Sequence, residues 1–253
     1  MNRPVPGVLE HPISLSVVIP AFNEERRLQA TLAELSAWLG GTGWDWDILV
    51  VDDGSTDGTA AVVEAVGRRD ERIALRREPH RGKGGAVRAG MLAARGAYRF
   101  LCDADLSMPP RELPRFLPPV LEGADVAIGS REGAGARRVG EPWRRHLTGR
   151  LFNLAIRWLV LDGIADTQCG FKMFTAAAAE TIFPLVTLDG WAFDVEALSI
   201  ARRQGLRIVA VPIEWHYHST SQLSVTRDAW RMLRDVLKVR ARIGRGGRAA
   251  PPG

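Results

Sequence analysis

The sequence predicts an α/β protein in which one mostly parallel sheet has helices on both faces and forms a single domain. Short runs of β-branched and aromatic residues alternate along the chain with longer segments of helical spacing, and this alternation is typical of such a sheet. Most of the apolar runs end in polar or glycine-rich sequence. Because ligands of parallel sheets bind beyond the carboxyl ends of the strands, these polar segments mark the expected site.

The first strand is expected at residues 15–19, where Pro20 should stop it. Asn23 should then cap a helix that carries Glu24 and Glu25 in its first turn and runs to about residue 39. Turn and capping residues after the second strand predict the start of another helix. The remaining strands are expected at residues 46–51, 73–77, 98–102, 125–128 and 171–174, and the remaining helices at residues 83–94, 110–121, 147–161, 193–203 and 227–240.

The composition narrows the classes of partner and compartment. The net charge of +5 points to anionic partners such as phosphates, nucleic acid or an anionic membrane, although an arginine-rich surface can also reflect compositional bias. Two cysteines imply no disulfide framework and fit a reducing cytoplasm. No segment reaches the roughly 18 uncharged apolar residues of a membrane-spanning helix, and the proline-rich start lacks a signal peptide's apolar run. Residues 1–13 and 242–253 are expected to be flexible.

The pair Asp103 and Asp105 follows an apolar strand directly. In an extended segment, residues i and i+2 point to the same side, so both carboxylates can face one point. Hard, anionic oxygen ligands suit Mg²⁺ or Mn²⁺ that also holds a substrate phosphate. The alternative is an ordinary turn, because this pattern also begins many turns.

Two further strand ends carry candidate binding residues. Asp52 and Asp53 lie in a turn beside the end of the first strand, where carboxylates could accept hydrogen bonds from a nucleoside base or ribose; alternatively they only cap the next helix. Lys83 begins a glycine-rich helix start, where backbone N–H groups and the helix dipole favour phosphate. The spacing matches neither a P-loop nor a dinucleotide fingerprint.

Taken together, residues 17–25, 50–57, 82–84 and 103–105 resemble glycosyltransferase family 2, of the GT-A fold, and the resemblance extends over roughly residues 15–239. Residues 166–172 and 191–196 resemble, within that family, the dolichyl-phosphate glucosyltransferases and polyprenyl-phosphate sugar synthases. The resemblance implies a metal-dependent, inverting transfer of a hexose from a nucleotide sugar to a polyprenyl phosphate, and we expect UDP-glucose as the donor.

The resemblance also divides the domain, residues 14–241, into a nucleotide-sugar half at about residues 14–130 and an acceptor half at about residues 131–241. It implies Asp52 and Asp53 near the nucleoside, the two metal aspartates near the diphosphate, and Gln168 near the donor. The residues expected to bind the nucleotide sugar are Pro20, Ala21, Asn23, Glu24, Asp52, Asp53, Ser55, Lys83, Asp103, Ala104, Asp105 and Gln168.

The expected chemistry depends on the acceptor. A phosphate monoester has a second pKa near about 6, so it is largely a dianion at neutral pH and can attack without a strong base. The metal at Asp105 and the charge of Lys83 should then stabilise the departing diphosphate. Asp194 is the candidate base or acceptor-orienting group, with Glu196 and Asp166 as alternatives. Asp194 could instead only cap a helix.

An arginine-rich segment follows the fifth strand, and its side chains could clamp an acceptor phosphate or form a solvated charge run. These arginines are Arg131, Arg137, Arg138, Arg144 and Arg145. His216 and His218 would share one side of a strand, so His218 could reach the metal; a strand's polar end is the alternative.

Residues 227–240 place apolar side chains on one helical face among basic ones. This helix could lie on an anionic membrane, pack on the sheet or form a dimer contact. We expect a cytoplasmic protein, or one peripheral on the inner face of the membrane, with no nucleic-acid partner; the oligomeric state stays open. The alternatives are transfer to a soluble acceptor, a nucleotidyltransferase, and a non-enzymatic basic module, which would not explain the ordered carboxylates.

Overall fold

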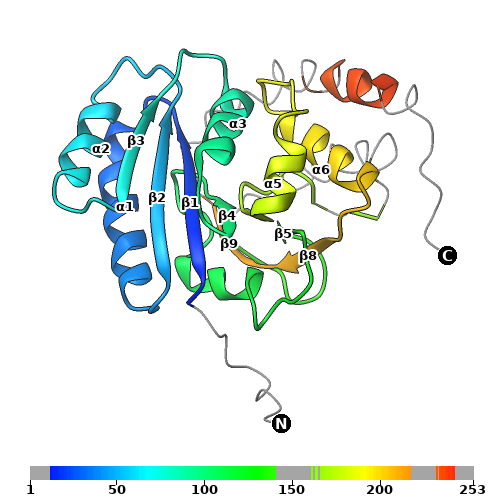
Figure 1. Cartoon of the computed structure of the whole chain (residues 1–253), viewed down its shortest axis with the longest axis horizontal. Coiled ribbons are helices and arrows are strands. Elements are labelled where there is room, and N and C mark those ends of the chain that lie inside the picture. Colours follow the sequence, from blue (N-terminus) through cyan, green and yellow to red (C-terminus); the bar gives the residue numbers. More distant parts are fainter. Residues whose placement is uncertain are drawn as a thin grey trace, which may run out of the picture.

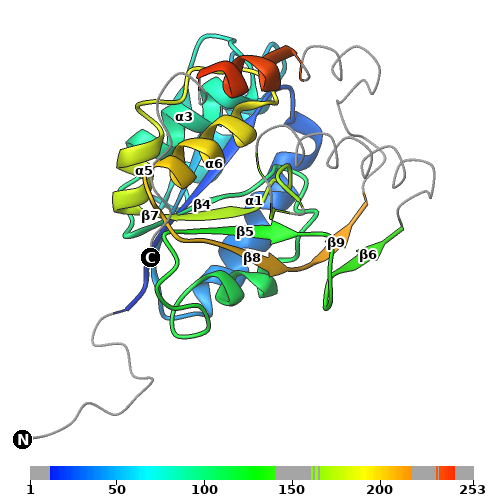
Figure 2. The same cartoon turned by 90° about the vertical axis from the view of Figure 1, so that its right-hand side faces the viewer.

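The computed structural model describes residues 12–140, 161, 163–164, 166–217, 232 and 234–242. Seven strands form one sheet in the order β3-β2-β1-β4-β7-β5-β8, and β6 pairs with β9 in a separate ribbon (Figures 1 and 2). The strands are β1 (Ser14–Ala21), β2 (Asp45–Asp52), β3 (Ile73–Arg77), β4 (Tyr98–Leu101), β5 (Val126–Ser130), β6 (Arg137–Val139), β7 (Lys172–Thr175), β8 (Ile208–Pro212) and β9 (Glu214–His216). The helices are α1 (Glu25–Gly40), α2 (Thr59–Gly67), α3 (Lys83–Ala93), the 3₁₀ helix η1 (Pro110–Phe116), α5 (Ala176–Ile182) and α6 (Phe193–Arg203), and residues 234–242 are also helical.

The expected mostly parallel sheet is confirmed, with one reversed strand. Strands β1, β2, β3 and β4 run parallel to one another, and β5 runs parallel to β8, whereas β7 is antiparallel to both β4 and β5. The start of β7 therefore lies at the same edge as the ends of β4 and β5. Strand β1 lies between β2 and β4, so the order of the strands reverses there: β2 and β3 extend the sheet to one side of β1, and β4 begins the other side. Ligands of open α/β sheets bind at such a point.

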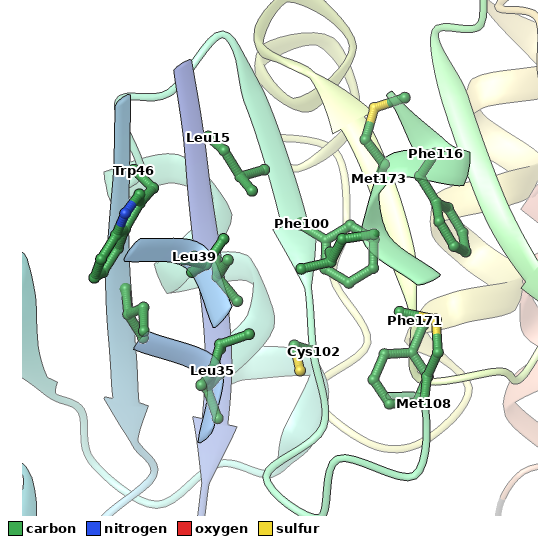
Figure 3. Close-up of a cluster of buried hydrophobic side chains, with 14 of the residues drawn as sticks. Leu15, Leu35, Leu39, Trp46, Phe100, Cys102, Met108, Phe116, Phe171 and Met173 are labelled. Atoms are coloured by element: carbon green, nitrogen blue, oxygen red, sulfur yellow. The ribbon is translucent and has the colours of Figure 1, made fainter. Parts of the chain in front are cut away.

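Helices cover both faces of the sheet, because neighbouring residues of each buried strand point to opposite sides. Val17 and Ile19 join a core that includes α1, α2 and η1, whereas Val18 joins the core beneath α3, α5 and α6 (Figure 1). Figure 3 shows part of the first core, where Phe100 lies edge-on to Phe116 with ring centroids 5.2 Å apart. The two cores fix the sheet edge on which the site is built.

Three local expectations are wrong. Strand β1 continues through Pro20 to Ala21. Asn23 does not cap α1: its φ is 55°, and its side-chain oxygen accepts the Thr56 N–H of the neighbouring turn at 2.9 Å. The expected helix at residues 110–121 is a short 3₁₀ helix that contains Pro114, and an internal proline cannot donate a helical hydrogen bond.

The two ends of the domain also differ from expectation. Ile13, expected in a flexible leader, is buried in the core, and its carbonyl accepts the Asp45 N–H at 2.9 Å. Arg242, expected in a flexible tail, belongs to the C-terminal helix and contacts Glu196 at 2.9 Å. Residues 1–11 and 243–253, all but the last residue of the helix expected at 147–161, and the start of the helix expected at 227–240 lie outside the described residues. Within the described ranges, no helix has the length and apolar character needed to cross a membrane.

Gly90 allows α3 to approach the sheet closely. A Cβ atom at this position would lie 2.4 Å from Val18 Cγ1 and 2.8 Å from Val51 Cγ2, both in buried strands. We therefore expect Gly90→Ala to lower the free energy of unfolding by about 1–3 kcal/mol, because overpacking outweighs the gain in helix propensity. Gly40→Ala, at the end of α1 with no atom within 4 Å of its Cβ, should be neutral or stabilising. Urea denaturation checks both; equal stability of the two variants would contradict the packing argument.

Candidate functional site

The candidate site lies at the carboxyl edge of the sheet, around the point where β1 separates β2 from β4. Glu24 follows β1, and Asp103 and Asp105 follow β4. Lys83 opens α3, and Asp194 lies in the first turn of α6. These five side chains come from four segments that the sequence separates widely, and the sheet topology brings them to one edge.

The two metal-candidate aspartates are partly exposed after β4. Asp105 Oδ1 accepts the Ser107 N–H at 3.0 Å, and the Ser107 carbonyl accepts the His216 N–H at 2.7 Å. The end of β9 is thereby tied to the turn that carries both carboxylates. Leu106 within this turn has a φ of 46°, a conformation that costs a non-glycine residue about 1–2 kcal/mol and is most common at functional sites.

Gly170 is a site residue that the sequence did not single out. A Cβ atom there would lie 1.7 Å from Asp103 Oδ2, so any larger residue would displace the carboxylate. The backbone of the segment before β7 therefore forms one wall of the aspartate site. Gln168, expected near the donor, lies in the same segment, where its N–H donates to Asp166 Oδ1 at 3.3 Å.

The turn around Asp103 and Asp105 is strongly anionic. Burial raises the pKa of Glu24, and the charges of Asp105 and Asp103 raise it further, against the opposing effect of Arg27, which pairs with Glu24 at 2.7 Å. These interactions show that Glu24 lies within electrostatic range of both aspartates. A divalent cation would relieve the mutual repulsion of the three carboxylates.

Mg²⁺ or Mn²⁺ fits this donor set as a partly liganded ion. The described ranges contain no group of three or more histidine, cysteine, aspartate or glutamate side chains arranged to hold a metal, so these ranges offer the two carboxylates rather than a closed cage. Mg²⁺ is commonly held by one or two carboxylates together with water and substrate phosphates. His218, the expected third ligand, lies outside the described residues.

Lys83 faces the aspartates directly. Its Nζ lies 2.6 Å from Asp103 Oδ1 and 5.1 Å from the ring centroid of Trp191. Burial alone would lower the pKa of Lys83, but the charges of Asp103 and Asp194 raise it overall. The ammonium therefore stays protonated at neutral pH and lies where it can stabilise anionic charge.

The expected role of Asp53 at the nucleoside does not match its contacts. Its carboxylate accepts the Arg81 and Gly82 N–H groups, each at 2.9 Å, and lies 2.8 Å from His80 Nδ1. Asp53 therefore holds the loop before α3. The His80 ring stacks on Phe22 with centroids 4.2 Å apart, which places an aromatic pair beside the turns after β1 and β2.

We expected free backbone N–H groups at the start of α3 to bind phosphate, but two of these groups already have a partner. The N–H groups of Gly84 and Gly85 both donate to the carbonyl oxygen of Asp189, at 2.7 and 3.3 Å. The carbonyl thus takes the backbone donors that a phosphate would use. Binding of phosphate at this helix start must rely on the Lys83 side chain rather than on a ring of free backbone N–H groups.

The turns after β1 and β2 lie together, as expected. Ala21 pairs with Asp52 in the sheet register. Asp52 Oδ1 accepts the Ser55 N–H at 3.0 Å, and Ser55 Oγ accepts the Asn23 N–H at 2.9 Å. The expected nucleotide-binding residues of the two turns, Pro20, Ala21, Asn23, Glu24, Asp52 and Ser55, are therefore neighbours, with Ala21 and Asp52 buried beneath the others.

Asp194 is paired with a lysine that the sequence analysis missed. Lys172 is 1% exposed, and its Nζ lies 2.7 Å from Asp194 Oδ1 and donates to the Cys169 carbonyl at 2.5 Å. Burial raises the pKa of Asp194, although Lys172 and Lys83 oppose this effect. The sequence did carry a signal for this ion pair, because Lys172 is a charged residue within the apolar run at residues 171–174.

The two alternative bases are committed to structural contacts. Glu196 accepts the N–H groups of Thr187 and Leu188, at 2.9 and 2.8 Å, in addition to its ion pair with Arg242. Asp166 accepts two hydrogen bonds from the Arg131 guanidinium, at 2.7 and 2.8 Å. Neither carboxylate is placed to accept a proton from a substrate.

The same contacts correct the role of Arg131, which was expected to bind the acceptor phosphate. Its guanidinium pairs with buried Asp166 instead. Arg138 pairs with Glu132 at 2.8 Å, whereas Arg137 is largely exposed and lies 3.8 Å from Glu214. Arg137 is thus the most accessible of the described candidates. The other two expected arginines, Arg144 and Arg145, lie outside the described residues.

A mostly parallel sheet with paired aspartates beyond β4 is the arrangement of a GT-A glycosyltransferase. The chain belongs to glycosyl transferase family 2, whose model matches residues 16–183. It is 33% identical to a dolichyl-phosphate beta-glucosyltransferase of Saccharomyces cerevisiae, over 95% of this chain and 79% of that protein. A Homo sapiens protein of the same name is 31% identical, over 94% of this chain and 78% of that protein.

Solved structures show the same fold. Glucosyl-3-phosphoglycerate synthase from Mycobacterium tuberculosis, in complex with Mn²⁺ and UDP-glucose, superposes with a TM-score of 0.67 at 23% identity, covering 90% of this chain and 79% of that chain. The expected fold, family and enzyme class are therefore confirmed.

The Asp166–Arg131 pair should contribute to stability in a pH-dependent way. Burial alone would raise the pKa of Asp166, but Arg131 lowers it to about 2, below the ordinary 3.8. The contribution is therefore complete above about pH 4 and is lost as the pH falls towards 2. Asp166→Asn should cost about 3 kcal/mol at pH 7, because it removes the carboxylate that pairs with the partly buried guanidinium of Arg131.

Urea denaturation at a series of pH values checks this expectation. The stability difference between the natural protein and Asp166→Asn should shrink as the pH falls from about 4 to 2. Glu71→Gln, which removes an exposed carboxylate in the turn before β3, is the control and should change stability little. A difference for Asp166→Asn that stays constant with pH would contradict the role given to its charge.

Proposed function

We propose that this glycosyltransferase transfers glucose from UDP-glucose to a polyprenyl phosphate such as dolichyl phosphate, with inversion at the anomeric carbon and with Mg²⁺ or Mn²⁺ as cofactor. The observation that carries the proposal is the meeting of Asp103, Asp105 and Lys83 at the carboxyl edge of the sheet, beside the turns after β1 and β2. The names of the relatives support glucose and a dolichyl-type acceptor. The Mn²⁺ and UDP-glucose complex of the structural neighbour supports the donor and the cofactor.

The donor is expected to lie across the two turns with its diphosphate towards Lys83. Asp52 and its neighbours in the turns after β1 and β2 would provide acceptors for the nucleoside, and Asp103 with Asp105 would hold the metal. A bound divalent ion supplies charge stabilisation for the diphosphate leaving group. Lys83 adds a second positive charge in a partly buried site, where electrostatic interactions are stronger than in water.

The state of Asp194 favours a phosphate acceptor over a hydroxyl acceptor. A hydroxyl must lose its proton to a base as it attacks, and Asp194 is ion-paired with Lys172 at 2.7 Å. A phosphate dianion needs no such base. Asp194 therefore orients groups in the site, and positioning supplies much of the catalysis. Transfer to a soluble acceptor is the second candidate.

The first test is transfer from radiolabelled UDP-glucose with Mg²⁺ or Mn²⁺, with polyprenyl phosphate and a soluble extract offered side by side. We expect label in the lipid phase, and a loss of at least a hundredfold in rate with Asp105→Ala, because the metal site loses one of two carboxylates. Asp45→Ala, at the exposed start of β2, is the control. Label confined to the aqueous phase would exclude the lipid acceptor.

We also propose that the C-terminal helix binds an anionic membrane. Val236 and Val239 face the core, whereas Arg234, Leu237 and Lys238 are 71%, 48% and 50% exposed. Because the apolar face packs on the core, contact with a membrane would come from the basic outer face, which an anionic lipid surface attracts. Arg242 ties this helix to Glu196, which lies two residues after Asp194 in α6, so this docking would bring the site towards the lipid.

Cosedimentation with vesicles tests the docking. The double variant Arg234→Glu/Lys238→Glu should bind vesicles of phosphatidylglycerol about tenfold or more weakly, because each basic residue near the surface is worth about 1 kcal/mol. Arg68→Glu/Arg69→Glu, with the same change in net charge at the end of α2, should bind as the natural protein does. Equal loss in both variants would show that only net charge matters and would contradict docking through the helix.

A further inference from the structure

The Lys83 ammonium forms an ion pair with one of the two carboxylates assigned to the metal. Its Nζ lies 2.6 Å from Asp103 Oδ1, and both side chains are only partly exposed. A divalent cation would have to share this carboxylate with the ammonium or displace it. The same ammonium is also the cation best placed to meet the donor diphosphate. The inference below rests on the proposed function.

The backbone around Lys83 is fixed on both sides. The preceding residues, Arg81 and Gly82, donate their N–H groups to Asp53, and the following residues, Gly84 and Gly85, donate theirs to the Asp189 carbonyl. Movement at this position is therefore confined to the side chain. Lysine suits such movement, because its charge lies at the end of a flexible four-carbon chain.

The second anion near Lys83 is already neutralised. Asp194 lies within electrostatic range of Lys83, but its closest cation is Lys172, at 2.7 Å. Lys172 thereby weakens the attraction of Asp194 for Lys83. On the other side, Nζ lies 5.1 Å from the ring centroid of Trp191, which offers a face that attracts cations without holding them tightly. Asp103 is the strongest partner, and a diphosphate could replace it.

We propose that Lys83 couples metal binding to donor binding by exchanging partners. In the free protein, Nζ neutralises Asp103 and keeps divalent cations from binding tightly to the anionic turn. When a nucleoside diphosphate binds, Nζ moves to its phosphate oxygens, and Asp103 is released to the cation. Each ligand then favours the other by the same factor, as linkage requires.

An alternative role for Lys83 predicts the opposite effect of its removal. If the ion pair only held Asp103 in a geometry suited to the metal, loss of the ammonium would weaken metal binding. If Lys83 competes with the metal, its loss strengthens binding. The sign of the change therefore separates exchange from static support.

The experiment measures Mn²⁺ binding to the nucleotide-free protein by electron paramagnetic resonance of the free ion. We expect Lys83→Met to bind Mn²⁺ at least fivefold more tightly than the natural protein, and Lys83→Arg to resemble the natural protein. Unchanged or weaker binding by Lys83→Met would overturn the proposal. Arg69→Met, which removes an exposed charge after α2, should leave the affinity unchanged.

Two further measurements keep the result interpretable. Adding Asp103→Asn to Lys83→Met should abolish the gain, because the released carboxylate is its source; a gain that persists would contradict the proposal. Mn²⁺ should raise the affinity of the natural protein for UDP, after correction for direct binding of Mn²⁺ to UDP. In Lys83→Met this increase in UDP affinity should be at least threefold smaller. Circular dichroism confirms that each variant is folded.

Failure of this inference differs from failure of the proposed function. A natural protein that transfers glucose from UDP-glucose, combined with no gain in Mn²⁺ affinity for Lys83→Met, would overturn only the exchange. A natural protein that binds neither Mn²⁺ nor UDP would overturn both. Tighter Mn²⁺ binding together with the reduced enhancement would support both.

Discussion

The antiparallel pairing of β7 with β4 and β5 is the constraint on which the site depends. Because β7 runs against its neighbours, the segment that precedes it meets their carboxyl ends. This brings Gly170 against Asp103 and Lys172 against Asp194. A parallel β7 would have carried these residues to the opposite edge of the sheet. The reversal thus joins residues from the second half of the chain to the site residues of the first half.

Charge pairing makes this junction possible. Lys172, Asp194, Lys83 and Asp103 alternate in sign through a region with little access to water. A buried charge without a partner is strongly destabilising, whereas a paired and hydrogen-bonded charge is tolerated. The arrangement is better understood as a way to hold charges ready for a ligand than as a source of stability.

The sequence predicted those features that depend on local pattern. The order of strands and helices up to β5, the helix at residues 193–203, the pair of aspartates after β4 and the adjacent turns after β1 and β2 all follow from short segments. The errors concern backbone donors and caps. Asn23 bonds to Thr56, and Asp189 caps α3 from more than a hundred residues away in the sequence. Such contacts exist only after the chain has folded, so propensity cannot reveal them.

The loop before α6 has a consequence for how the chain tolerates change. Leu188 donates its N–H to Glu196, which also holds Arg242 of the C-terminal helix, and the next residue, Asp189, holds the start of α3 through its carbonyl. Two adjacent peptide units thus bridge both sides of the site. Surface loops usually accept insertions and deletions readily. This one has to keep its length as strictly as a strand keeps its register, because one added residue would separate the two anchors.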